Sequence, residues 1–304
     1  MITNKHKDRL FNFLFGREEN KDWTLSLYNA VNHTDYTDSG EIEIMTIEDV
    51  VYMKMKNDIS FLLHCYLNLY EQQSTFNPNM PLRELMYVGK LYDKYIHKHR
   101  LNIYGTKLIS IPVPKLMVFY NGATDADDMM ILRLSDAFPD TADGSESDIE
   151  VKVTMLNINH GHNRELMAAC RPLAEYAWFI AEIRQNRKKS DIEAAVDKAI
   201  DDMPGDYLIR DFLIGHRAEV KDMCITEYNE AETMQMLKEE AHEEGRIEGH
   251  RTGLIEGSIK MIIELGREDG LDDAAILRRI QKKTGLPSDE AAACLRRYGG
   301  QAIK

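Results

Sequence analysis

The sequence lacks the features that mark several common classes of protein. No stretch approaches about 18 consecutive apolar residues, which argues against a membrane-spanning helix. The first segment, MITNKHKDRLFNFLFG, is amphipathic and has neither the apolar core nor the cleavage site of a secretory signal. GxSxG, P-loop and GxGxxG motifs are absent as well.

Cysteine is scarce and scattered. The 304 residues include four cysteines, and no two of them form a CxxC pair. This spacing argues against a structural zinc site and favours a reducing compartment. We therefore expect a cytoplasmic protein.

A positive net charge, which a nucleic-acid enzyme often carries, is also missing. The formal net charge is −13. The negative charge is distributed unevenly along the chain. Residues 1–120 hold 14 basic and 14 acidic residues, whereas the remainder holds 24 basic and 37 acidic residues. The acidity thus belongs to the C-terminal part, and the neutral N-terminal part stays open to a nucleic-acid function.

A hydrophobic content of 43% supports a real core. In the first part of the chain, alternating and continuous apolar runs predict strands and 3.6-residue periodicity predicts helices. The expected helices are 8–15, 23–31 and 82–97, and the expected strands are 42–44, 50–55, 59–63, 67–71, 115–120, 131–134 and 151–156. This order of elements predicts a mixed α/β domain over residues 1–160.

From residue 163 onward the pattern is helical only. The expected helices are 164–187, 191–203 with Ser190 as cap and Glu193 in a capping box, 207–217, 218–224, 228–265, 271–283 and 288–298. We therefore expect a helical extension over 161–227, a long helix over 228–265 and a small helical segment over 266–304.

The stretch Val50–Arg83 carries the main candidate site. Asp58 stands at the head of one strand, and Glu71 lies near the end of the next. Residues two apart on a strand share a face, so Gln73 points the same way as Glu71 and Gln72 points the other way. Two carboxylates and an amide at one sheet edge suggest a divalent-metal site.

Structural interpretations of the same residues stay open. Asp58 also suits a hairpin turn, and Glu71 suits the polar position of an alternating strand. The basic and aromatic helix over 83–100 reads better as a half-buried helix with a solvated face than as a DNA-binding one. His160 and His162 are candidate metal ligands, but assignment to a polar loop fits them better.

Glycine recurs every fourth residue at Gly245, Gly249, Gly253 and Gly257. Each glycine destabilises a helix by ~1 kcal/mol relative to alanine, so the repeat needs a reason. Close approach of a second helix is one reason, and a flexible charged tether is the alternative. If the helices pair, residues 228–265 mediate self-association into a homo-oligomer.

Several strings together resemble one known family. They are DRLFNFLFG, KNDISFLL, LNLYEQQSTFNPNMPLR, VFYNG and EEGRIEGHRTGLIEG, and the resemblance covers roughly residues 5–260. The chain resembles the Rpn-type recombination-promoting nuclease and transposase family, a branch of the PD-(D/E)xK superfamily. The resemblance implies a mixed central sheet flanked by helices, followed here by an all-helical C-terminal region.

The resemblance also implies the roles of individual residues. Asp58 and Glu71 become metal-binding carboxylates, with Gln72 among the metal ligands, and Gln73 takes the place of the usual lysine. The cation that the resemblance implies is Mg²⁺, a hard cation that prefers oxygen ligands, with Mn²⁺ as a substitute. Because Gln73 is neutral, it orients water by hydrogen bonding but does not act as a cation or a general base.

An acidic residue from the first helix often joins such sites. Asp8 matches that position best, with Glu18 or Glu19 as the fallback.

The resulting hypothesis is a Mg²⁺-dependent endonuclease that hydrolyses phosphodiester bonds of double-stranded DNA in recombination or mobile elements. The alternative is a catalytically degenerate DNA-binding or oligomeric scaffold of the same fold, suggested by Gln73 and the acidic charge. A protein-interaction module without DNA binding is a third hypothesis.

Overall fold

The computed structural model describes residues 10–45, 58–139 and 147–299. Asp8 and the expected strand over 50–55 lie outside these residues. The chain divides into two compact units, Met1–Ala231 and Glu232–Lys304. The first unit contains both the sheet and the helical extension that the sequence suggests over 161–227.

The first unit is built on a mixed six-stranded sheet with the order β1-β2-β3-β4-β6-β5. The strands are β1 (Glu43–Ile44), β2 (Ile59–Leu63), β3 (Tyr66–Gln73), β4 (Val113–Tyr120), β5 (Met129–Arg133) and β6 (Lys152–Asn157). β3, β4 and β6 are parallel neighbours, and the other pairs are antiparallel. The predicted mixed α/β architecture is confirmed, including the hairpin of β2 and β3.

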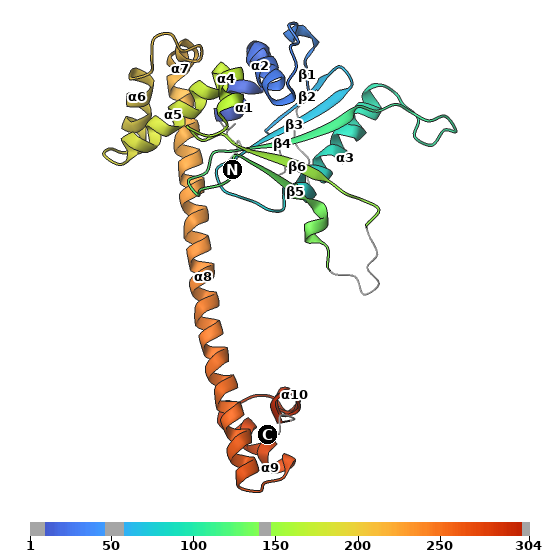
Figure 1. Cartoon of the computed structure of the whole chain (residues 1–304), viewed down its shortest axis with the longest axis vertical. Helices are drawn as coiled ribbons and strands as arrows, with labels where there is room; N and C mark the ends of the chain where they lie inside the picture. Colours follow the sequence, from blue (N-terminus) through green and yellow to red (C-terminus); the bar gives the residue numbers. More distant parts are fainter. Residues whose placement is uncertain (1–9, 46–57, 140–146, 300–304) are drawn as a thin grey trace, which may run out of the picture. The chain divides into compact units, whose positions relative to one another are not determined.

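Helices cover both faces of the sheet (Figure 1). α3 (Met80–Lys98) packs on one face, where Tyr87, Val88 and Leu91 meet apolar residues of β2 and β3. Its outward side is exposed, so the expectation of a half-buried helix with a solvated face is confirmed.

The opposite face carries the larger core. α1 (Leu10–Phe15), α2 (Lys21–Asn32) and α5 (Arg171–Arg187) cover it. Phe11 packs against Phe119 of β4 at 5.1 Å between ring centroids, and Phe119 lies 5.2 Å from Tyr70 of β3. The strands β2 and β3 are therefore buried on both faces, and their polar residues stand out against an apolar background.

The helical extension differs from the sequence expectation in two places. The single helix predicted over 164–187 is α4 (Arg164–Ala169) and α5, separated by Cys170 in extended conformation. Pro172 has no N–H for the next helical hydrogen bond, so a new helix begins there. Further on, Asp191, not Ser190, caps α6 (Ile192–Asp201), because its side chain accepts from the Ala194 N–H.

Two further helices complete the extension. α7 (Arg210–Gly215) is shorter than the helix predicted over 207–217. The helices expected over 218–224 and 228–265 are one continuous helix, α8 (Arg217–Glu268). The residues between them contain neither proline nor glycine, so nothing in the sequence interrupts the helix.

In the second unit, the end of α8 packs with α9 (Asp273–Thr284) and α10 (Ser288–Gly299). Gly266 allows this contact, because a Cβ there would lie 2.7 Å from the Ile276 side chain. The repeated glycines Gly245 to Gly257 have no atom within 4 Å of such a position in the described part of the chain. No described helix has the length and apolar character needed to span a bilayer.

Candidate functional site

Asp58 and Glu71 lie opposite each other at the end of the β2–β3 hairpin. Ile59 pairs with Tyr70, so the next position in the register places Asp58 across from Glu71. Such opposed side chains share one face of the sheet. The Asp58 N–H donates to Glu71 Oε1 at 3.0 Å, and the Gln72 N–H donates to Asp58 Oδ2 at 2.7 Å. The two carboxylates therefore form the last rung of the hairpin.

The rung sits at the carboxyl edge of the parallel strands, on the face that α3 covers. Leu67 and Leu69 of β3 point to this face and pack with α3. Glu71 and Gln73 continue the same alternation, and both are buried.

Glu84 of α3 is a third carboxylate at this place, and the sequence analysis does not identify it. It is 0% exposed, and neither carboxylate oxygen has a hydrogen-bond partner among the described residues. Burial raises its pKa to about 8; nearby Arg83 opposes this shift, and the charge of Asp58 adds to it. An uncompensated buried carboxylate is costly, so this position calls for a functional reason.

A sequence signal for Glu84 does exist. It shares its helical stripe with Tyr87, Val88 and Leu91, at spacings of three, four and seven residues. An acidic residue on an apolar helix face is unusual enough to mark a candidate site.

The pKa of Glu71 is raised as well. Burial raises its pKa well above the ordinary value, and the charges of Asp58 and Glu84 add to this effect. Arg83 opposes it, with Nη2 3.9 Å from Glu71 Oε2. Arg83 also donates to the hydroxyl of Tyr87 at 3.2 Å. The cluster therefore places three carboxylates beside one guanidinium.

The donor set suits a hard divalent cation. It consists of carboxylate and amide oxygens, and a cation would offset both the burial and the like charges that raise the pKa of Glu71 and of Glu84. Within the described residues, however, no three His, Cys, Asp or Glu side chains already form a metal cage. Asp58 and Glu71 each accept a hydrogen bond from a backbone N–H with one oxygen, so their side chains must adjust before they can bind a metal. Glu71 and Glu84 must also lose their protons.

The two glutamines divide between the faces of the sheet. Gln73 points with Glu71, and its buried Oε1 has no hydrogen-bond partner in the part of the chain that the structure describes. The Gln72 side chain lies on the other face, where Nε2 donates to Asn121 Oδ1. As a metal ligand, Gln72 can contribute only its main-chain carbonyl, because N–H and C=O of one strand residue point to the same edge and its N–H points to Asp58.

Glu18 and Glu19, the fallback acidic residues expected near the first helix, do not join the cluster. Asp8 lies outside the described residues. Glu18 and Glu19 occupy a short 3-10 turn, are exposed, and pair with Lys21 at 2.6 Å and Arg17 at 3.2 Å. Among the described residues, Glu84 of α3 is the third acidic residue beside Asp58 and Glu71.

On the α5 side, polar groups continue along the carboxyl edge. Asn121 donates to the hydroxyl of Tyr176 at 3.0 Å. Arg184 donates to Asn159 Oδ1 at 2.7 Å and to the Asn121 carbonyl. Because the Asn121 N–H bonds the Gln73 carbonyl, this arginine places a positive charge close to the end of β3.

The His160–His162 segment is a polar loop, as the sequence suggests. His162 Nδ1 lies 2.7 Å from Asp128 Oδ1, an ion-pair contact when the ring is protonated.

Comparison of the chain with models of known protein families, with curated proteins and with solved structures finds no match. The case for a function therefore rests on the site and on the strings that resemble the Rpn-type family.

Proposed function

We propose that the protein is a Mg²⁺-dependent DNA endonuclease of the PD-(D/E)xK type, with Mn²⁺ as a substitute cation. The observation that carries the proposal is the group of two buried glutamates, Glu71 and Glu84, and the partly buried Asp58 at the sheet edge, with Arg83 as the facing cation. Strongly perturbed carboxylates at one place are typical of functional sites. The family resemblance adds phosphodiester hydrolysis in double-stranded DNA, in recombination or mobile elements.

In this proposal, Asp58 and Glu71 would hold the cation, together with the main-chain carbonyl of Gln72. A cation held there would supply a water of lowered pKa and a positive charge for the scissile phosphate. Gln73 orients the water by hydrogen bonding, since its amide carries no charge. Glu84 would accept a proton from that water once the bound cation has displaced its own proton.

Arg83 and Arg184 have positioning roles. Arg83 lies beside Glu71 and Arg184 lies at the end of β4. In the proposed complex, Arg83 would contact one phosphate oxygen and Arg184 the neighbouring phosphate. Guanidinium groups suit this task because their forked N–H donors match phosphate geometry.

A non-cutting DNA-binding or oligomeric scaffold is the second candidate. Two observations favour it: Gln73 stands in place of a lysine, and Asp58 and Glu71 each hold a backbone amide with one oxygen. Such a protein would bind DNA without hydrolysing it.

Plasmid cleavage distinguishes the two candidates. We expect the protein to nick supercoiled DNA with Mg²⁺ or Mn²⁺ but not with EDTA. We expect Asp58→Asn to slow cleavage by about 100-fold, the size expected for loss of one group that stabilises the transition state. Asp93→Asn is the matched control, since Asp93 is exposed on α3. DNA binding without nicking under all metal conditions would favour the scaffold, and undiminished cleavage by Asp58→Asn would refute the site.

We also propose that α8 mediates self-association within the second unit. Met236, Leu254, Met261 and Leu265 are exposed, and their spacings of 18, 7 and 4 residues are close to whole helical turns. They therefore form one apolar stripe, and an identical stripe on a second copy buries it. At other positions on α8, the four glycines permit a second helix to approach closely.

Light scattering tests this proposal. We expect a mass well above the 35.0 kDa of one chain, and a return to that mass in the double variant Leu254→Glu, Met261→Glu. Leu108→Glu is the control, because Leu108 is 94% exposed in the first unit. A monomeric wild-type protein, or a double variant of unchanged mass, contradicts the proposal.

A further inference from the structure

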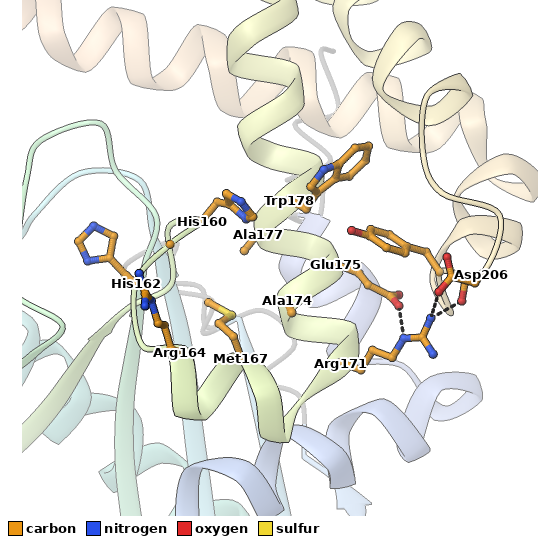
Figure 2. A pocket seen from close by; sticks show the side chains of 12 residues that line it. His160, His162, Arg164, Met167, Arg171, Ala174, Glu175, Ala177, Trp178 and Asp206 are labelled. Atoms are coloured by element: carbon orange, nitrogen blue, oxygen red, sulfur yellow. Dashed lines mark hydrogen bonds and ion pairs between the residues drawn. The ribbon is translucent and has the colours of Figure 1, made fainter.

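A cavity of about 370 Å³ opens on the helical extension of the first unit (Figure 2). Its walls come from the 160–164 loop, from α4 and α5, and from the turn before α7. The volume falls in the range of about 300–1,000 Å³ that is typical of small-molecule sites. None of the carboxylates of the proposed metal site lines it.

Aromatic and apolar side chains form the inner part of the cavity. Trp178 of α5 and Tyr207 lie 5.4 Å apart between ring centroids, at an interplanar angle of 81°. Both rings are half-buried, and Met167 and Ala177 complete the apolar surface. Such a surface accepts a planar ring, which stacks on one aromatic side chain and meets the edge of the other.

A buried carboxylate keeps this wall in place. Glu175 is 3% exposed and accepts from Arg171 Nε at 2.8 Å and from the Ile209 N–H at 3.1 Å. Arg171 Nη2 lies 2.9 Å from Asp206 Oδ2. The turn that carries Tyr207 is thereby tied to the first turns of α5. The aromatic wall is therefore organised before any ligand arrives.

Arg164 and Arg171 bring positive charge to the cavity, and Glu175 and Asp206 pair with Arg171. Figure 2 shows His160 and Arg164 on one side of the cavity, and Arg171 and Asp206 on the other. Arg171 already has two carboxylate partners. Arg164 is exposed and has no ion-pair partner among the described residues, so an anionic group can take that place.

We propose that this cavity binds a nucleoside phosphate, with the base against Trp178 and the phosphate at Arg164 and His160. A planar ring and an anion at opposite ends of one small ligand match the two ends of the cavity. The ligand is either a free mononucleotide or the phosphorylated terminal nucleotide of a single strand. The site needs no divalent cation, so it stands or falls independently of the proposed nuclease activity.

Calorimetric titration of the full chain in EDTA tests the proposal. We expect saturable binding of AMP, and weaker but measurable binding of adenosine. Trp178→Ala weakens binding of both ligands about tenfold, as expected for loss of one stacked base. Arg164→Ala weakens AMP binding about tenfold and leaves adenosine binding unchanged, because only AMP carries the phosphate.

Matched controls separate the site from general effects. Tyr104→Ala removes an aromatic ring that is 93% exposed, and Arg133→Ala removes an exposed arginine of β5. Neither change is expected to alter AMP binding. If Trp178→Ala does not fold by circular dichroism, the comparison of Arg164→Ala with Arg133→Ala decides, since both positions are exposed.

Two ligand forms identify the source of the nucleotide. Tighter binding of a 5′-phosphorylated single-stranded oligonucleotide than of dAMP assigns the cavity to a strand end, and the reverse order assigns it to a free nucleotide. Absence of saturable binding by AMP, dAMP and the oligonucleotide overturns the proposal. Equal affinity of AMP for wild type and for folded Trp178→Ala and Arg164→Ala variants overturns it too.

Discussion

Replacing Glu71 with glutamine is expected to abolish metal-dependent DNA cleavage and to make the metal-free protein more stable. Activity falls by at least about 1,000-fold, equivalent to ~4 kcal/mol in the activation free energy, because a metal-binding carboxylate is lost. Stability at pH 8 rises because the amide keeps the shape of the side chain and cannot ionise, whereas burial and the neighbouring Asp58 and Glu84 disfavour the ionised form of Glu71.

Two measurements on the same samples check this result. A plasmid assay follows cleavage, and thermal unfolding at pH 8 follows stability with and without Mg²⁺. A cation that binds only the native state stabilises that state. We therefore expect Mg²⁺ to stabilise wild type but not Glu71→Gln, which lacks the binding carboxylate. Glu264→Gln, an exposed change on α8, is the control. A variant that cuts DNA normally, or that responds to Mg²⁺ like wild type, rules out Glu71 as a ligand.

The second large effect concerns pH and Glu84. Its pKa is raised from 4.5 to about 8 in the folded protein, first by burial. Between these values the folded state holds a proton that the unfolded state has released, so the free energy of unfolding falls as pH rises from 4.5 to 8. The slope reaches at most about 1.4 kcal/mol per pH unit for one such group. Glu71 contributes a slope of the same sign.

Urea unfolding across this pH range measures the slope. We expect Glu84→Gln to flatten it and to be more stable than wild type above pH 8, while Glu165→Gln, exposed on α4, changes nothing. Mg²⁺ should stabilise wild type more at pH 9 than at pH 6, since the cation competes with the proton. An unchanged slope in Glu84→Gln would show that its carboxyl group is ionised at neutral pH.

The sequence predicts much of the sheet because its strands carry strong local signals. Ile59–Leu63 and the run from Tyr66 to Gln73 are β-rich, and register then places Asp58 opposite Glu71 without further information. The alternation of side chains along β3 also predicts correctly that Gln72 and Gln73 point to opposite faces of the sheet. These features depend on neighbours in the chain, which sequence patterns describe well.

Glu84 is harder to predict because its environment comes from tertiary packing. The apolar stripe of α3 marks the buried side of the helix, but its contact with β3 beside Asp58 and Glu71 is not encoded in any local pattern. The break at Cys170 is different, since Pro172 marks it in the sequence. The expectation of a first-helix acid rests on the family pattern, and the exposed positions of Glu18 and Glu19 show that they do not join the cluster.

The two-residue turn at His64 and Cys65 has a consequence for the distant end of the hairpin. His64 adopts a left-handed conformation, with φ of 54°, and the turn sets which residues of β2 and β3 face each other. A strand reverses its faces when it slips by one residue. A strand slip of one residue, caused by a residue gained or lost in this turn, would therefore bring Tyr70 or Gln72 opposite Asp58 in place of Glu71. The chemical identity of the site is encoded as much in the length of that turn as in the carboxylates themselves.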